Sequence, residues 1–232
     1  MKNSHVTAII AAAGTGSRFG GDIPKQFLPV SGGKPLLAHT LSVFENAERI
    51  SEIIVALPKL TKDNAWDIRK SARFVAGGSS RQESVYNALK AINPHTDIVL
   101  IHDGARPFIT EQSINALIDC AMEGYAAVPG VRATDTVKIT DTDGFVLSTP
   151  DRETVWAVQT PQAFPRDMIL LAHEKAREDG FTGTDDATLA ERFGIVKVKI
   201  LEGDPRNIKI TTQADLAIAE AVIRYVGAEA AK

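Results

Sequence analysis

The chain has 232 residues, of which 44% are hydrophobic and 24% are charged, and its formal net charge is −3. These values are ordinary for a soluble globular protein and give no bulk electrostatic reason to bind nucleic acid or an anionic membrane surface. No apolar run approaches the roughly 18 residues that span a bilayer. The one cysteine, Cys120, lies on an apolar helical pattern and is expected in the core. We therefore expect a cytoplasmic protein with no nucleic-acid or membrane partner, in which local cations hold any anionic ligand.

Strands of the buried type alternate with amphipathic helices along the chain. Apolar runs predict strands at residues 6–12, 52–58, 73–77, 97–103, 126–131, 196–201 and 207–211. Helical periodicity predicts helices at residues 35–47, 63–72, 80–92, 111–124, 166–180 and 213–226. This alternation predicts an α/β fold, with a mostly parallel, Rossmann-like open sheet and helices on both faces. Ligands are then expected at the carboxyl ends of the strands.

Residues 134–156 break this alternation. Their centre, "DTDG" at residues 141–144, is a turn signal between two short, half-polar runs, which predicts a protruding β-hairpin. An isolated hairpin has too little apolar surface to be stable in water. The hairpin must therefore rest on this chain or on a second copy of it, and it is a candidate dimerisation arm.

A glycine-rich loop follows the first predicted strand, in the stretch "AIIAAAGTGSRFGGDIPKQFLPV" from Ala8 to Val30. The loop of nucleoside triphosphatases requires Gly-Lys-Ser or Gly-Lys-Thr, and the sequence contains neither. The dinucleotide-binding fingerprint requires G-x-G-x-x-G and an acid after the second strand. Here the glycine spacing is one residue too long and that acid is missing. Glycines alone are weak evidence, so a loop without a ligand stays open at this point.

Two cations, Arg18 and Lys25, distinguish this loop from an ordinary turn. Positive charges beside a glycine-rich loop suit a triphosphate whose charge shifts during a reaction. The segment "AAAGTGSRFGGDIPKQF" resembles the nucleotidyltransferase signature of the sugar-phosphate cytidylyltransferases, and most closely that of the enzymes acting on 2-C-methyl-D-erythritol 4-phosphate. The resemblance covers essentially the whole chain. It implies a single nucleotidyltransferase domain over residues 1–232, in which Arg18 and Lys25 are catalytic.

Two further segments, "GGSSRQESVYNAL" and "IVLIHDGARPF", resemble the nucleotide-binding blocks of that family. The resemblance implies that the nucleotide is bound by Ala12, Ala13, Gly14, Gly16, Gly78, Arg81, Ser84, Asp103 and Gly104. By residue type alone, the first segment is also a helix start in which Glu83 lies at capping-box spacing from Ser80. Asp103, which ends an apolar run, is by type either a metal or ribose ligand or the ion-pair partner of Arg106. The resemblance favours a ligand of Mg²⁺ carried by the triphosphate.

The segments "TDTVKI", "PDRETVWAVQTPQAF" and "GDPRNIKIT" resemble the parts of the family that hold the acceptor. The resemblance implies that the acceptor is bound by Arg106, Thr136, Arg152 and Lys209. Thr136 and Arg152 lie on the predicted arm and would reach the neighbouring subunit's site. By residue type alone, an arginine on a half-polar arm is a solvated charge, although a guanidinium can bind a phosphate with two hydrogen bonds. Asp204 is a weaker candidate for a second metal contact.

The activity implied by the resemblance is transfer of a cytidylyl group from CTP to 2-C-methyl-D-erythritol 4-phosphate by a homodimer with Mg²⁺. A cytidylyltransferase for another polyol phosphate, such as ribitol 5-phosphate, is the nearer alternative. A dinucleotide-dependent oxidoreductase and an idle nucleotide-binding module are the more distant ones. The fingerprint mismatch disfavours the oxidoreductase, and the joint presence of Arg18, Lys25 and Asp103 disfavours the idle module.

Overall fold

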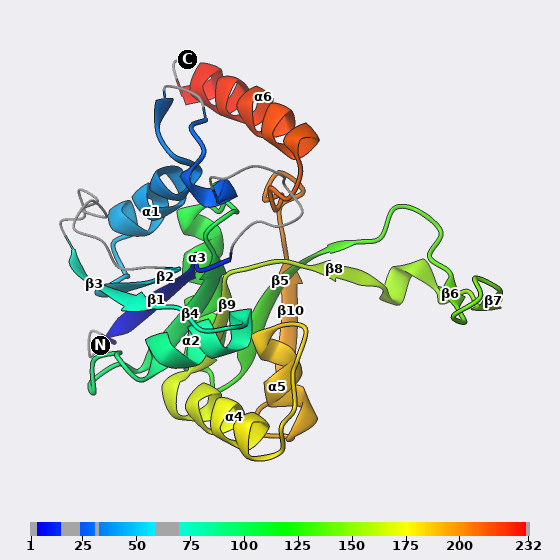
Figure 1. Cartoon of the computed structure of the whole chain (residues 1–232), viewed down its shortest axis with the longest axis horizontal. Coiled ribbons are helices and arrows are strands. Elements are labelled where there is room, and N and C mark those ends of the chain that lie inside the picture. Colours follow the sequence, from blue (N-terminus) through cyan, green and yellow to red (C-terminus); the bar gives the residue numbers. More distant parts are fainter. Residues whose placement is uncertain (1–3, 15–23, 31–32, 59–69, 231–232) are drawn as a thin grey trace.

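A mixed β-sheet flanked by helices forms the body of the protein, from which a long hairpin extends (Figure 1). The computed structural model describes residues 4–14, 24–30, 33–58 and 70–230. Its strands are β1 (Val6–Ala11), β2 (Glu52–Leu57), β3 (Ser71–Ala76), β4 (Ile98–Asp103), β5 (Ala126–Arg132), β6 (Ile139–Thr140), β7 (Val146–Ser148), β8 (Trp156–Val158), β9 (Gln162–Pro165) and β10 (Val198–Glu202). Its helices are α1 (Leu36–Asn46), α2 (Arg81–Leu89), α3 (Glu111–Met122), α4 (Arg166–Glu178), α5 (Asp186–Arg192) and α6 (Gln213–Ala230), with 3₁₀ turns η1 (Lys25–Phe27) and η3 (Arg152–Thr154).

The main sheet has the strand order β10-β5-β9-β4-β1-β2-β3, and β8 pairs with β5 beside this path. The pairs β1–β2, β2–β3, β1–β4 and β5–β10 are parallel. Strand β9 is antiparallel to both β4 and β5, and β8 is antiparallel to β5. The expected mostly parallel α/β sheet is confirmed, with two short antiparallel strands added to it.

Helices cover both faces of the sheet because alternate residues of each central strand point to opposite sides. On β1, Ala8 and Ile10 belong to an apolar cluster with buried residues of α1 and α3. Ile9 belongs to a second cluster with residues of α2, α4 and α5. Helix α6 packs through Ala219 on a third cluster, which includes Leu36 at the start of α1. Within the described part of the chain, none of the helices combines the length and the apolar character that a membrane crossing requires.

Three helices start at polar capping residues that the sequence places before each apolar pattern. The side chains of Ser80, Thr110 and Asp185 each accept a hydrogen bond from the backbone N–H three residues further on, at the starts of α2, α3 and α5. Such caps satisfy one of the N–H groups that a helix leaves unpaired at its start. The Ser80 half of the expected capping box is therefore present, but the Glu83 carboxylate accepts from the N–H and hydroxyl of Ser79 and not from the N–H of Ser80.

Two predicted elements differ from the structure or lie outside it. Residues 207–211, predicted as a strand, form none and run as irregular chain after β10. Their alternating isoleucines reflect burial of Ile210 in the cluster beneath α6 and not a place in the sheet. The predicted helix at residues 63–72 falls mostly outside the described residues, and its last part begins β3.

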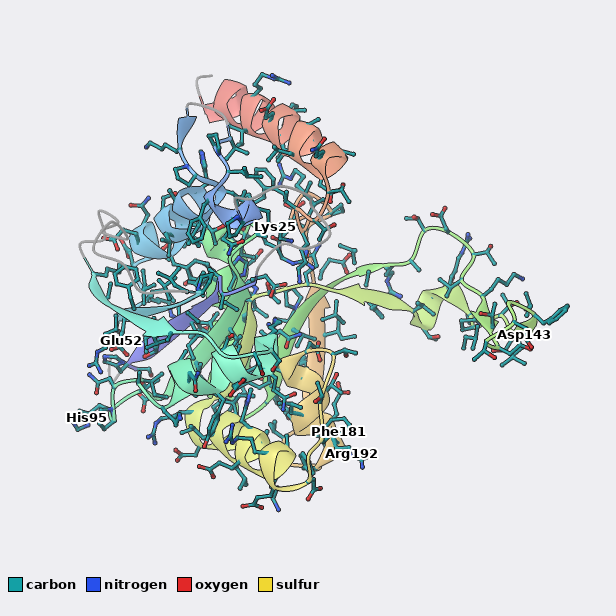
Figure 2. All side chains as sticks on the ribbon, viewed as in Figure 1. Lys25, Glu52, His95, Asp143, Phe181 and Arg192 are labelled. Atoms are coloured by element: carbon teal, nitrogen blue, oxygen red, sulfur yellow. The ribbon has the colours of Figure 1, made fainter. Side chains whose placement is uncertain are left out.

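The predicted hairpin is present, with β6 and β7 paired in a separate sheet around the predicted turn. The Asp141 carboxylate accepts hydrogen bonds from the N–H groups of Asp143 and Phe145, and Gly144 takes a positive φ of 88°. Figure 2 shows Asp143 at the tip of the arm, far from Lys25 in the body. Hydrogen bonds within the turn therefore fix the hairpin, which extends away from the main sheet.

Candidate active site

The candidate site is centred on Asp103, at the carboxyl end of β4 and in register with Ala11 at the end of β1. The N–H of Gly104 donates to the Ala11 carbonyl oxygen at 3.0 Å. The glycine-rich loop therefore leaves the sheet beside Asp103, at the strand ends where ligands of open α/β sheets bind. A Cβ at position 104 would lie 3.0 Å from the Cβ of Ala12, so this close approach of two chain segments favours glycine.

Three cations surround the Asp103 carboxylate. Its Oδ1 lies 3.0 Å from Nε of Arg81, and its Oδ2 lies 2.7 Å from Nζ of Lys209 and 3.8 Å from Nε of Arg106. Burial would raise the pKa of Asp103, but Arg81 and Lys209 lower it to well below the usual range. The carboxylate is therefore ionised at any physiological pH. The ion pair with Arg106 that residue type suggested is present but is the longest of the three contacts, and Arg81 and Lys209 lie closer.

Arg81 links Asp103 to a second carboxylate, Asp186, that is buried in the protein. Its guanidinium NH1 lies 2.7 Å from Oδ2 of Asp186, and Oδ1 of Asp186 lies 3.1 Å from Nε2 of His173. Burial alone would lower the pKa of Arg81, but Asp186 and Asp103 raise it. Asp186 is the first residue of α5, and its position at a helix start does not by itself indicate this contact. Its role as a partner of Arg81, 105 positions earlier in the chain, depends on tertiary contact.

Lys25 and Lys209 reach the same region from two irregular segments. Lys25 begins η1, and its Nζ donates to the carbonyl oxygen of Ile210 at 2.7 Å. The buried amide of Gln26 donates to the carbonyl oxygens of Ala12 and Gly14, at 2.7 and 2.8 Å, and so holds the start of the glycine-rich loop. Gly16 and Arg18, the other expected residues of this loop, lie outside the described residues.

The loop before α2 packs against the start of the glycine-rich loop. A Cβ at Gly77 would lie 2.2 Å from the Cβ of Ala13, so the two loops touch where only glycine fits. The buried hydroxyl of Ser84 accepts from the Gly78 N–H at 2.9 Å and donates to the Ser80 carbonyl oxygen at 2.8 Å. Ser84 therefore holds the shape of this loop, next to the N–H groups at the start of α2, which can bind an anion.

A hydrogen-bonded relay beneath Asp103 fixes its backbone. The hydroxyl of Thr160 accepts from the Asp103 N–H at 3.0 Å and lies 3.1 Å from Nδ1 of His102. Nε2 of His102 lies 2.9 Å from the Arg106 carbonyl oxygen, so Nε2 carries the proton and Nδ1 accepts from Thr160. Burial lowers the pKa of His102 to about 4, which keeps the ring neutral at physiological pH.

The remaining acceptor residues fall into two groups. The guanidinium of Arg106 donates through NH1 to the Asn207 carbonyl oxygen at 2.7 Å, and only 12% of its side chain is exposed. Thr136 and Arg152 are exposed on the arm, which points away from the body of its own chain (Figure 1). The structure therefore brings Arg106 and Lys209 to Asp103 and leaves Thr136 and Arg152 remote from it.

Asp103 is the carboxylate best placed to hold the expected Mg²⁺. Among the described residues, no group of three or more His, Cys, Asp or Glu side chains is placed to hold an ion by itself. Mg²⁺ in nucleotide enzymes commonly takes only one or two carboxylates and completes its shell with phosphate oxygens and water. The ionised carboxylate of Asp103, beside two glycine-containing loops, fits that donor set. Asp204 pairs instead with Arg206 at 2.7 Å.

A separate pocket lies at the amino ends of the strands and is lined by His5, His95, Asp97 and Arg166, among others. Figure 2 shows His95 at the end of the sheet opposite Lys25. The start of the glycine-rich loop at residues 12–14, Asp103, Lys25 and Lys209 are not among the residues that line this pocket. Its lining carries both acids and bases, and we do not assign it to the nucleotide.

Known proteins resemble this chain over nearly its whole length. Residues 6–225 match the family model described as 2-C-methyl-D-erythritol 4-phosphate cytidylyltransferase. The enzyme of that name from Geobacillus thermodenitrificans is 48% identical over 223 residues, covering 93% of this chain and 96% of the relative. Its counterpart from Caldanaerobacter subterraneus is 44% identical, covering 95% and 99% of the two chains.

A solved structure extends the likeness to three dimensions. The crystal structure of 4-diphosphocytidyl-2C-methyl-D-erythritol synthase from Anaerococcus prevotii superimposes with a TM-score of 0.86 at 36% identity, covering 96% of this chain and 97% of that one. Sequence and fold therefore agree over nearly the full length. The chain belongs to the 2-C-methyl-D-erythritol 4-phosphate cytidylyltransferase family.

Proposed function

We propose that the chain transfers the cytidylyl group of CTP to 2-C-methyl-D-erythritol 4-phosphate, giving 4-diphosphocytidyl-2-C-methyl-D-erythritol and pyrophosphate for isoprenoid precursor synthesis. One observation carries the proposal together with the family. Arg81 and Lys209 meet the carboxylate of Asp103 at the end of β4. Lys25 lies beside them, since its Nζ donates to the carbonyl oxygen of Ile210, the residue after Lys209. A site for two phosphorylated substrates needs cations from both sides, and this arrangement supplies them.

The chemistry needs charge stabilisation more than proton transfer. A phosphate monoester oxygen of the acceptor attacks the α-phosphorus of CTP and forms the new P–O bond, while the bond from the α-phosphorus to the bridging oxygen breaks and pyrophosphate leaves. Because the second pKa of such a phosphate is about 6, the nucleophile is already largely deprotonated at neutral pH. The reaction therefore needs no general base. Catalysis then rests on positioning and on cations that meet the developing charge.

We assign roles to this chain's residues accordingly. Lys25 and Arg18 bind the phosphates of the nucleotide and stabilise the charge on the leaving pyrophosphate, and Lys209 orients the phosphate of the acceptor. The loop that contains Gly77 and Gly78, held in shape by Ser84, binds the cytidine end of CTP beside Ala13. Asp103 would hold Mg²⁺, which when bound offsets phosphate charge and orients the triphosphate.

The assay that tests this function is pyrophosphate release from CTP with 2-C-methyl-D-erythritol 4-phosphate, and separately with ribitol 5-phosphate. We expect turnover with the first at a kcat/KM far above that with the second. The Lys25→Ala variant should lose much more in kcat than in CTP affinity, because Lys25 is assigned to charge that develops in the transition state. A preference for ribitol 5-phosphate, or an unchanged kcat in Lys25→Ala, would contradict the proposal.

We further propose that the chain works as a homodimer in which residues 134–156 form the dimerisation arm. On the arm, 72% of Phe145 and 66% of Leu147 are exposed. Such exposure of large apolar side chains to water is unfavourable, and a contact with a second copy of the chain would relieve it. Thr136 and Arg152 would then serve the partner's site. A cytoplasmic location fits the single, buried Cys120, which can form no disulfide within the chain, and burial raises the pKa of its thiol.

Mixing two inactive variants tests this arrangement. A dimer that combines one Lys25→Ala subunit with one Arg152→Ala subunit contains one site with both native residues. With random pairing, about a quarter of all sites regain both residues, so activity should return to roughly that fraction of the native value. Two variants that stay as inactive when mixed as they are alone would show that Arg152 serves its own chain or has no role.

A further inference from the structure

Lys209 is placed beside Asp103 by a segment that has no regular secondary structure. Residues 203–211 follow β10 and include no strand or helix. Yet Nζ of Lys209 lies 2.7 Å from the Asp103 carboxylate, although 36% of its side chain is exposed. A lysine has a long, flexible side chain with a large rotamer entropy, so its placement depends on a well-fixed backbone. No β-ladder provides that here.

Asn207 is buried at the point where this segment crosses two others, with 0% of the residue exposed. Its Nδ2 donates to the Thr160 carbonyl oxygen at 2.9 Å and lies 3.4 Å from Oε1 of Gln159. Its main-chain N–H donates to the Asp204 carbonyl oxygen at 2.9 Å, and its own carbonyl oxygen accepts from NH1 of Arg106 at 2.7 Å. One residue therefore joins the strand-end loop at 159–160, the loop after β4 and the segment that carries Lys209.

The amide has one orientation that suits these partners. Two oxygen atoms, the carbonyl of Thr160 and Oε1 of Gln159, face Nδ2, so a flipped amide would set an oxygen against two acceptors. A buried polar group gains from such bonds only when its partners are in place. The side chain of Asn207 is therefore a specific tie between chain segments and not a space-filling residue.

A second anchor follows Lys209. Ile210 is fully buried, and its N–H donates to the Ala105 carbonyl oxygen at 2.9 Å. Its own carbonyl oxygen accepts from Nζ of Lys25 at 2.7 Å. Lys209 thus projects from a short span held on one side by Asn207 and on the other by Ile210. Both anchors attach to elements that carry other residues of the site.

We infer that Asn207 is a positioning residue that sets where the ammonium group of Lys209 lies, and hence where the acceptor phosphate binds. The part that concerns the acceptor rests on the proposed function. Asn207 has no exposed surface and acts only through the backbone that it shares with Lys209. A small displacement of that backbone moves the ammonium group away from Asp103 and from an incoming phosphate.

The kinetic test uses Asn207→Ala and separates positioning from general stability. We expect KM for 2-C-methyl-D-erythritol 4-phosphate to rise about tenfold while KM for CTP stays within about twofold, because a misplaced binding group weakens only its own substrate. Ile114→Val, a core change in α3, which carries none of the site residues, is the control for lost stability and should leave both KM values unchanged. Equal rises in both KM values, or none, would overturn the inference.

A double-mutant cycle with Lys209→Ala gives a sharper result. If Asn207 acts through Lys209, then Asn207→Ala should change the acceptor KM by less than about twofold once Lys209 is already removed. Two full effects that multiply would show that Asn207 acts independently of Lys209. Should Asn207→Ala fail to fold, Gln159→Ala takes its place. That change removes the 3.4 Å partner, leaves Asn207 in the chain, and should raise the acceptor KM about threefold.

A measurement without turnover separates this inference from the proposed function. Amine labelling of the native protein, read by mass spectrometry, should modify Lys209 several-fold faster in Asn207→Ala, because the contact with Asp103 is loosened. The exposed Lys175 on α4 serves as an internal reference whose labelling should not change. Unchanged labelling of Lys209 would refute the positioning role even if the enzyme is active. A native enzyme that turns over neither polyol phosphate would refute the function and leave the labelling result to decide the positioning role.

Discussion

The buried ring of His102 predicts a specific pH dependence of stability. The ring has 0% exposure and is held between Thr160 and the Arg106 carbonyl oxygen, and burial lowers its pKa from 6.5 to about 4. As pH falls through 6.5 the unfolded chain takes up a proton that the folded chain does not, so the free energy of unfolding falls. A difference of about 2.5 units at 1.36 kcal/mol each amounts to about 3 kcal/mol between neutral pH and pH 4.

The variant His102→Gln tests this because an amide can accept from Thr160 and donate to the carbonyl oxygen without titrating. Urea denaturation at several pH values between 7.5 and 4 should show the native protein losing about 3 kcal/mol more than the variant. His95→Gln, which changes an exposed histidine at the other end of the strands, controls for removal of an imidazole. Parallel pH profiles for the native protein and His102→Gln would refute the assignment of a neutral, buried ring.

Three further changes test other parts of the structure. Asp186→Asn leaves Arg81 with one buried partner instead of two and should cost about 3 kcal/mol at pH 7, seen as a fall in Tm of roughly 6 to 12 °C. A cost below about 1 kcal/mol would mean that desolvation cancels the attraction. Gly104→Ala places a Cβ 3.0 and 3.1 Å from two neighbouring side chains. It should lower the free energy of unfolding by about 1 to 3 kcal/mol in chemical denaturation, and it should weaken CTP binding in calorimetry. The pair Phe145→Ser and Leu147→Ser should shift sedimentation from dimer toward monomer, and an unchanged dimer would exclude the arm as its contact.

The central part of the fold could be predicted because its strands carry a strong local signal. Continuous apolar runs placed β1, β2 and β4 to within about a residue at each end, since strands covered on both faces need apolar residues throughout. Strand β9 has no such signal. It is four residues long, contains Gln162 and Pro165, and is a strand only because β4 and β5 lie on either side of it. Tertiary contact, which the sequence does not display, decides elements of this kind.

The site could be predicted as a set of residue types but not as a set of contacts. The sequence and its resemblance pointed to Arg81, Asp103 and Lys209, and these three meet in the structure. The same reasoning missed Asp186 and Asn207, because a buried carboxylate and a buried amide have no local pattern that separates them from a helix cap or a loop residue. The contacts that define their roles are long-range, since Arg81 lies 105 positions from Asp186 and Thr160 lies 47 positions from Asn207. Whether any of these residues binds CTP or the acceptor stays a prediction.

The irregular course of residues 203–211, which include the strand predicted at residues 207–211, is what lets Lys209 reach Asp103. In the sheet order, β10 is separated from β4 by β5 and β9. Three strand spacings of about 4.8 Å place β10 roughly 14 Å from β4, so a chain that continued as a strand would keep Lys209 that far from Asp103. The segment instead leaves the sheet after Glu202 and crosses the carboxyl ends of the strands. Asn207 replaces the missing ladder with side-chain hydrogen bonds, and the lysine reaches the aspartate because the strand ends where it does.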